Sequence, residues 1–164
     1  MSGAAIRPGL ASDAARICAI YNHYVRETVV TFEEEPVPER EMAERIGDVS
    51  ATWPWLVAED AGHVLGYAYA APWKTRSAYR FAVESTVYLA PEFTGRRIGT
   101  QLYQELLAAL RERGAHCVIG GVALPNAASV ALHERLGFRK IAHFGEVGWK
   151  LGRWVDVAYW ELIL

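Results

Sequence analysis

Apolar residues recur along the chain with two periods, and each period predicts a different kind of element. Ile17, Ile20 and Tyr24 repeat at helical spacing. Ser12 stands just before them and is expected to cap the helix, because a serine hydroxyl can accept a free backbone N–H of the first turn. The pattern weakens after Val25, where we expect this helix to end.

Short apolar runs bounded by turn residues predict strands. They lie at Ile6–Arg7, Trp55–Glu59, Val64–Ala71, Phe81–Leu89 and Cys117–Val122, and the alternating tail Arg139–Leu164 predicts two more. Gly62 sits where a hairpin turn between the second and third runs needs positive φ. The β-branched stretch Thr28–Phe32 also favours extended backbone.

Three further helices are expected, and they determine the predicted topology. They cover Glu39–Val49, Ile98–Arg113 and Pro125–Leu136, with Gly114 and Gly137 placed to end the last two. A long helix between Phe81–Leu89 and Cys117–Val122 makes those strands parallel, with a right-handed crossover. The predicted class is α/β: a mixed, mostly antiparallel sheet with a central parallel pair and helices on both faces.

Length, charge and composition narrow the possible functions. A chain of 164 residues indicates one domain spanning residues 1–164. Seventeen Lys and Arg nearly balance nineteen Asp and Glu, which argues against nucleic-acid and membrane-surface partners. No apolar run reaches the roughly 18 residues of a membrane span, and the N-terminus lacks a signal-peptide pattern, so we expect a cytoplasmic protein. Cys18 and Cys117 are predicted to be reduced and buried, with no metal site.

The segment from Gly95 to Gly99, which contains Arg96 and Arg97, joins a strand to a helix beginning at Ile98. The first N–H groups of a helix lack intrahelical partners and carry partial positive charge, so this connection suits a phosphate. A solvated turn is the alternative, because Gly- and Arg-rich connections are common.

A series of short motifs, in order along the chain, resembles a known family. They are Trp55–Glu59, Tyr69–Lys74 with Arg76 and Ala78–Tyr79, Glu84–Tyr88, Leu124–Asn126 with Ser129, His133–Glu134, Leu136–Phe138 and Gly152–Val157. From about Ile6 to Leu162 the chain resembles GNAT-superfamily N-acetyltransferases, and among them the phosphinothricin and methionine sulfoximine acetyltransferase group.

The resemblance implies acetyl-coenzyme A as co-substrate, with its pyrophosphate on the Gly95–Gly99 loop and its pantetheine in a splay between the two parallel strands. The implied coenzyme-binding residues are Val87, Tyr88, Leu89, Thr94, Gly95, Arg96, Arg97, Ile98, Gly99, Thr100, Asn126 and Ser129. Asn126 can cap its helix, bind the coenzyme, or do both. Thr94 and Arg97 depart from the family pattern, since they replace a basic or amide residue and a glycine.

Acetyl transfer needs a group that takes a proton from the acceptor's ammonium before the amine attacks, and Glu84 is the candidate base. The alternative is a structural Glu84 paired with an arginine. Backbone N–H groups near Tyr88 and Leu89 are the expected donors to the thioester oxygen. By resemblance, His133 is a general acid or proton shuttle for the departing thiolate, whereas taken alone it would be an ordinary core or surface histidine.

The same resemblance outlines an acceptor pocket. Lys74 and Arg76 are expected to bind the anionic groups of a small amino-acid-like substrate, with Tyr79, Thr86 and Tyr88 as walls and Phe32 closing the top. The implied reaction is direct acetyl transfer to an α-amino group. Acetylation of another amine or of a protein N-terminus stays open, as does coenzyme binding without catalysis.

A homodimer is expected, because the group usually pairs and the tail is rich in large rings. Trp149, Trp154, Tyr159 and Trp160 are more aromatic surface than one small sheet can bury. We expect one subunit to help build the acceptor pocket of the other.

Overall fold

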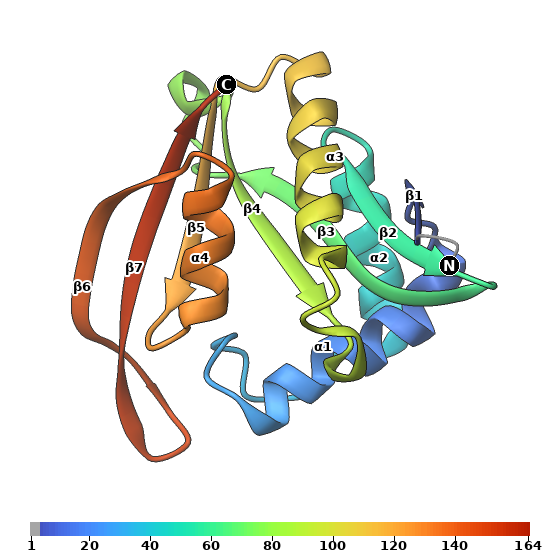
Figure 1. Cartoon of the computed structure of the whole chain (residues 1–164), viewed down its shortest axis with the longest axis horizontal. Coiled ribbons are helices and arrows are strands. Elements are labelled where there is room, and N and C mark those ends of the chain that lie inside the picture. The colour runs from blue at the N-terminus through green and yellow to red at the C-terminus, as the bar shows by residue number, and fades with distance from the viewer. Residues whose placement is uncertain (1–3) are drawn as a thin grey trace.

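The computed structural model describes residues 4–164 and contains one mixed sheet (Figure 1). The strands are β1 (Ala5–Pro8), β2 (Trp55–Asp60), β3 (His63–Pro72), β4 (Ala82–Leu89), β5 (Cys117–Ala123), β6 (Arg139–Lys150) and β7 (Arg153–Ile163). Their order across the sheet is β1-β2-β3-β4-β5-β7-β6. Neighbouring strands are antiparallel except β4 and β5, which are parallel, so the predicted fold class is confirmed.

Helices cover both faces of the sheet. They are α1 (Ala14–Glu27), α2 (Glu39–Ser50), α3 (Ile98–Glu112) and α4 (Ala127–Arg135), with short 3-10 turns η1 (Ala11–Asp13), η2 (Ser77–Tyr79) and η3 (Pro91–Phe93). Buried residues of α1 and α2 share a core with Val57 and Tyr67. α3 shares the other core with Val83 and Val118, and Leu132 of α4 packs there too, so α3 and α4 cover the opposite face.

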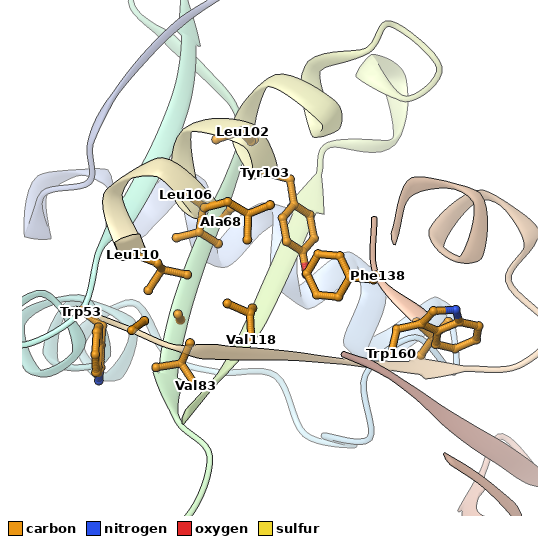
Figure 2. Packing of buried hydrophobic residues seen from close by; sticks show 14 of the residues in the cluster. Trp53, Ala68, Val83, Leu102, Tyr103, Leu106, Leu110, Val118, Phe138 and Trp160 are labelled. Atoms are coloured by element: carbon orange, nitrogen blue, oxygen red, sulfur yellow. The ribbon is translucent and has the colours of Figure 1, made fainter. Parts of the chain in front are cut away.

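The core under α3 fixes the helix that follows the Gly95–Gly99 loop. Leu102, Leu106 and Leu110 form its buried stripe and pack over the strands, as Figure 2 shows. Burying a leucine side chain contributes about 1.5–3 kcal/mol, so this stripe holds the N-terminus of α3 firmly in place.

The sequence-based prediction for the start of α1 was wrong. Ser12 lies inside η1 and does not cap the helix. The Asp13 carboxylate accepts the Leu10 N–H at 2.8 Å and pairs with Arg7 at 2.8 Å. The chain already turns helically from Ala11, so Ser12 lacks the extended backbone of an N-cap residue, and no side chain within residues 4–164 caps α1. The helix also continues to Glu27, beyond the expected end at Val25.

Thr28–Phe32 is a loop, not the extended segment that its β-branched residues favoured. The Thr28 hydroxyl donates to the Tyr24 carbonyl at 2.9 Å and accepts the Val30 N–H at 3.1 Å. The Thr31 carbonyl accepts the Lys150 ammonium at 2.7 Å. These side chains satisfy backbone groups that a sheet would otherwise pair, so local and tertiary hydrogen bonds override β propensity.

Parallel pairing between β4 and β5 covers Ala82 with Cys117, Val83 with Val118, and Glu84 with Ile119. β4 then continues to Leu89 and β5 to Ala123 without further pairing to each other. The strands therefore part after Glu84, and beyond that point the edges of β4 and β5 that face each other lack mutual strand pairing, although β4 still pairs with β3 and β5 with β7.

Candidate active site

Two cavities meet where β4 and β5 separate. The first, about 560 Å³, includes Glu84 and His133 in its lining. The second, about 530 Å³, extends to the loop before α3. Both are lined by Val30, Val87, Tyr88, Asn126 and Ser129, so they form one continuous groove through the splay.

The loop before α3 has the geometry of an anion site. Gly95 adopts a φ of 75° with open space where a side chain would stand, and Gly95, Gly99 and Thr100 line the second cavity. Arg97 also lines it, in a left-handed conformation with φ 64° at the N-terminal boundary of α3. The arginine guanidinium and the free N–H groups of the helix together suit a pyrophosphate.

Not every predicted coenzyme-binding residue faces the groove. Thr94 and Leu89 line the second cavity. Ile98 is 6% exposed and belongs to the core under α3. The Arg96 guanidinium lies 5.2 Å from the centre of the Phe93 ring and is outside both cavity linings.

Asn126 caps α4, as its position suggested. Its side-chain oxygen accepts the Ser129 N–H at 3.1 Å. Because Asn126 and Ser129 line both cavities, the capped end of α4 forms the wall opposite Val87 and Tyr88.

The Glu84 side chain lies at the last pair before the splay, and within residues 4–164 it forms no salt bridge with an arginine. Burial raises the pKa of its carboxyl group, and the nearby positive charge of Lys74 lowers it. A Cβ added at Gly121 would lie 3.4 Å from the Glu84 Oε1 atom, so the glycine leaves room for the carboxylate. The ionised carboxylate is therefore a stronger base than that of an exposed glutamate.

The tautomer of His133 follows from its partners. Nδ1 lies 2.7 Å from the Ser129 carbonyl oxygen, which can only accept, so Nδ1 carries the hydrogen. Burial lowers the pKa of the imidazole, and the bond to Ser129 opposes that shift. A pKa below the ordinary 6.5 makes His133 a neutral imidazole at pH 7, with Nε2 as an acceptor.

Tyr103 and Ser85 complete a buried polar chain that the sequence did not reveal. The Tyr103 hydroxyl lies 3.0 Å from the Nε2 atom of His133 and donates to it, and it bonds in turn to the Ser85 hydroxyl. A Cβ at Gly120 would lie 2.3 Å from Nε2, so this arrangement requires glycine there. The sequence feature that could have predicted this chain is Tyr103 itself, a residue with a polar hydroxyl that directly follows Leu102 on the buried side of α3.

The predicted acceptor residues divide into two groups. Phe32, Thr86 and Tyr88 line the first cavity. Lys74, Arg76 and Tyr79 lie on the linker between β3 and β4 and are outside its lining. The Lys74 ammonium stands 4.8 Å from the centre of the Trp73 ring.

Comparison with known proteins settles the family. Residues 17–138 match the model described as the acetyltransferase (GNAT) family, which is most of the chain. The chain belongs to this family. It is an acetyl-CoA-dependent N-acetyltransferase.

Individual relatives and a solved structure are similar over nearly the full length. The chain is 41% identical to phosphinothricin N-acetyltransferase of Streptomyces viridochromogenes, covering 95% of this chain and 85% of that one. It is 38% identical to the L-methionine sulfoximine/L-methionine sulfone acetyltransferase of Pseudomonas paraeruginosa, covering 98% and 95%. The GNAT superfamily phosphinothricin acetyltransferase of Sinorhizobium meliloti, solved with acetyl-CoA, has TM-score 0.96 and 38% identity, covering 99% and 89%. These similar proteins are thus named for phosphinothricin, methionine sulfoximine and methionine sulfone as acceptors.

Residues 4–164 contain no cluster of three or more His, Cys, Asp and Glu side chains able to hold a metal ion. Among the helices of this part of the chain, none has the length and apolar character that crossing a membrane requires.

Proposed function

We propose that the enzyme transfers the acetyl group of acetyl-CoA directly to the α-amino group of a small amino-acid-like acceptor of the phosphinothricin, methionine sulfoximine or methionine sulfone type. The observation that carries this proposal is the continuous groove at the splay, with an anion site at one end and Glu84 at the other. Two substrates entering from opposite ends meet there, so no covalent enzyme intermediate is needed.

The second cavity would hold the coenzyme. Its pyrophosphate would bind the N–H groups and Arg97 of the loop before α3, and its pantetheine would replace the missing pairing of Val87, Tyr88 and Leu89 with β5. A backbone N–H at this end of β4 would donate to the thioester oxygen as negative charge develops there. Arg96 and Ile98 would contribute through the shape of the loop.

Glu84 would accept the proton of the acceptor's ammonium group, directly or through a water molecule. Its position beside the first cavity and the rise in its pKa on burial support this role. The nitrogen lone pair can then attack the thioester carbonyl carbon, the C–S bond breaks, and the nitrogen loses a second proton as the amide forms, which balances the proton that the thiolate gains.

His133 would shuttle a proton to the departing thiolate. Because its Nε2 atom accepts a hydrogen bond from Tyr103 in the resting state, His133 must first gain a proton to act as an acid. Tyr103 and Ser85 offer the buried path by which that proton can move.

The first cavity would bind the acceptor between Phe32, Thr86 and Tyr88. Lys74 and Arg76 would attract its anionic groups from the linker, and Tyr79 would lie at the entrance. The influence of Lys74 on the pKa of Glu84 supports a location close to the reacting groups.

We further propose a homodimer that pairs through β6 and β7. Trp149 is 54% exposed and Trp154 is 59% exposed, and their rings contact each other at 4.9 Å between centroids. Phe144 and Val147 of β6 are half-exposed and line the first cavity, so a partner covering this hairpin would lie beside the acceptor. Trp160, in contrast, is buried within the subunit.

The test is release of free thiol from acetyl-CoA with a panel of amines. The panel contains methionine sulfoximine, methionine sulfone, phosphinothricin, ordinary amino acids, a polyamine and a peptide with a free N-terminus. We expect turnover mainly with the first three. Preferred turnover of the peptide or the polyamine would overturn the acceptor assignment, and thiol release with none of them would overturn catalysis on this substrate class.

A further inference from the structure

The loop of residues 28–33, here called the wall loop, forms one side of the first cavity through Val30, Thr31 and Phe32. It lies outside the sheet, so no ladder of backbone hydrogen bonds holds it. Its position depends on the side chains that contact it.

One of these contacts is a buried cation on β6. Lys150 is only 2% exposed, and its ammonium donates to the Thr31 carbonyl at 2.7 Å and to the Tyr24 carbonyl at 3.5 Å. Burial lowers the pKa of this amine, while the charges of Glu34 and Glu33 oppose that shift. An ammonium is costly to remove from water, and in this protein its hydrogen bonds go to the wall loop and to the end of α1.

A second contact lies two residues earlier on the same strand. A Cβ at Gly148 would stand 2.3 Å from two carbons of the Phe32 ring, so the ring rests directly on the glycine backbone. Side chains alternate along a strand, which places Gly148 and Lys150 on the inner face and Trp149 on the outer face. β6 therefore contacts the wall loop at two points: the Gly148 backbone packs against the Phe32 ring, and the Lys150 ammonium donates to the Thr31 carbonyl.

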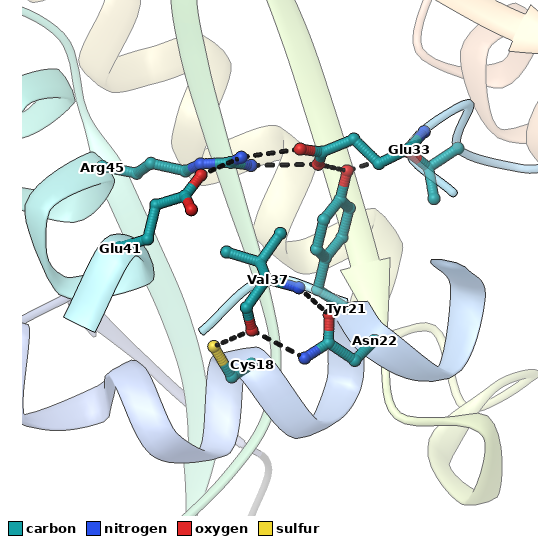
Figure 3. Close-up of polar contacts among 8 residues, drawn as sticks. Cys18, Tyr21, Asn22, Glu33, Val37, Glu41 and Arg45 are labelled. Atoms are coloured by element: carbon teal, nitrogen blue, oxygen red, sulfur yellow. Dashed lines mark hydrogen bonds and ion pairs between the residues drawn. The ribbon is translucent and has the colours of Figure 1, made fainter. Parts of the chain in front are cut away.

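The other side of the wall loop is held by α1 and α2. The Glu33 carboxylate accepts two hydrogen bonds from Arg45, at 3.0 and 2.6 Å, and one from the Tyr21 hydroxyl, as Figure 3 shows. Arg45 and Glu33 are more than a third exposed, so solvent weakens that pair. The contact with Lys150 is buried and is the better shielded of the two.

We propose that Lys150 is a positioning residue for the acceptor: its ammonium, together with the bare backbone of Gly148, holds Thr31 and Phe32 in place against the first cavity. This inference rests on the proposed function, which places the acceptor in that cavity. It assigns Lys150 no contact with either substrate.

The first test replaces Lys150 with methionine, which keeps the length of the side chain and removes its donors. We expect faster hydrogen–deuterium exchange in residues 28–34 and an acceptor KM raised on the order of 10-fold, the worth of one charge-assisted hydrogen bond. The KM for acetyl-CoA should change less, because Val30 is the only residue of the described wall loop that lines the second cavity, whereas Val30, Thr31 and Phe32 line the first. K150R, which restores charge and donors, should recover part of the loss.

Lys140→Met is the matched control, since Lys140 is an exposed lysine of the same strand. It should leave hydrogen–deuterium exchange in residues 28–34 and both KM values unchanged.

A second pair of variants tests Gly148 independently of Lys150. Gly148→Ala should displace Phe32 and raise the acceptor KM, whereas Gly145→Ala, whose Cβ would meet only the Asp156 carboxylate at 4.0 Å, should not.

Unchanged exchange in residues 28–34 of folded Lys150→Met would overturn the inference, as would faster exchange with an unchanged acceptor KM. If Lys150→Met does not fold, Gly148→Ala is compared with Gly145→Ala by exchange in residues 28–34 and by the acceptor KM. No difference between these two variants would then overturn the inference. The exchange experiment needs no acceptor. It therefore tests whether Lys150 holds the wall loop in place even if the amine panel contradicts the proposed acceptor class.

Discussion

At the scale of single residues, the surroundings of Glu84 and His133 shift the pKa values of these two groups in opposite directions. Burial raises the pKa of Glu84 and lowers that of His133, because burial disfavours the charged form of each group. A carboxyl group with a raised pKa is a stronger base when ionised, and a neutral imidazole is ready to accept a proton. The two residues can thus divide the proton transfers of one reaction.

Glu84→Gln keeps the shape of the side chain and cannot accept a proton. The rate with saturating acetyl-CoA should fall by roughly 100- to 10,000-fold at pH 7, the usual contribution of a positioned base. Wild-type activity should fall as pH drops through the Glu84 pKa, which lies above the ordinary 4.5, and the variant should lack that acidic limb. Steady-state rates over a pH series measure both effects. A variant within a few-fold of wild type, with chemistry rate-limiting, would make Glu84 structural.

Lys74→Ala tests the charge that acts on Glu84. Because the lysine lowers the pKa of the carboxyl group, its removal should move the acidic limb of the pH–rate profile to higher pH. Arg76→Ala is the comparison, from the same linker but without an effect on the Glu84 pKa. Identical profiles for Lys74→Ala and wild type would contradict the predicted coupling.

Tyr103→Phe removes one hydroxyl from the buried chain. The Nε2 atom of His133 loses the hydrogen bond that favours its neutral form, so the imidazole pKa should rise. Ser85 also loses a partner, and the free energy of unfolding should decrease by about 1–3 kcal/mol. NMR titration of the histidine rings and urea denaturation report these two changes. An unaltered His133 titration would show that Tyr103 does not control its protonation.

At the scale of elements, the junction of the loop with α3 carries local strain. Arg97 occupies a left-handed conformation that costs a non-glycine residue about 1–2 kcal/mol. The family pattern has glycine here, which adopts this conformation freely. The arginine therefore exchanges some stability for a positive charge beside the anion site.

Arg97→Gly and Arg97→Ala separate these two effects. Both lose the charge and should raise the KM for acetyl-CoA with little change in kcat, since pyrophosphate contacts act alike on ground and transition states. Only the glycine variant removes the strain of the left-handed backbone at position 97, so it should be more stable than the alanine variant by about 1 kcal/mol. Arg96→Ala should affect coenzyme binding less than either. Calorimetry and thermal denaturation test these expectations, which fail if coenzyme affinity is unchanged in all three.

At the scale of the whole molecule, apolar surface gathers on the β6–β7 hairpin. Trp149, Trp154, Phe144, Val147, Ile141 and Leu151 are each at least half exposed. A patch of this kind is typical of an interface. The hairpin also supplies Lys150 and Gly148 to the wall loop, so the proposed dimer interface and the proposed acceptor side share one strand.

Replacing Trp149 and Trp154 together by aspartate should convert a dimer into monomers, because two charges would have to be buried at the interface. Light scattering at micromolar concentration measures the mass. Leu10→Asp is the control, since Leu10 is 57% exposed but lies outside the hairpin. A wild-type protein with monomer mass would contradict the dimer.

Local sequence patterns determined the elements of this protein. The strands and helices follow from the apolar periods, and Gly62 has the expected positive φ. The parallel alignment of β4 and β5 follows from the intervening helix, because α3 returns the chain to the end of the sheet where β4 began, so β5 runs in the same direction. The Asn126 cap was equally readable, since it depends on residues close together in the chain.

Only the tertiary structure decided which buried polar groups meet. Lys150 and Thr31 are 119 positions apart, and Tyr103 and His133 are 30 apart. The order β4-β5-β7-β6 and the packing of α3 bring these pairs together, and no local periodicity encodes that order. The tertiary structure also decided that Thr28–Phe32 is a loop, and that Trp149 is exposed while Trp160 is buried. Spacing along the chain predicts which residues share a face, whereas their partners depend on how the faces are assembled.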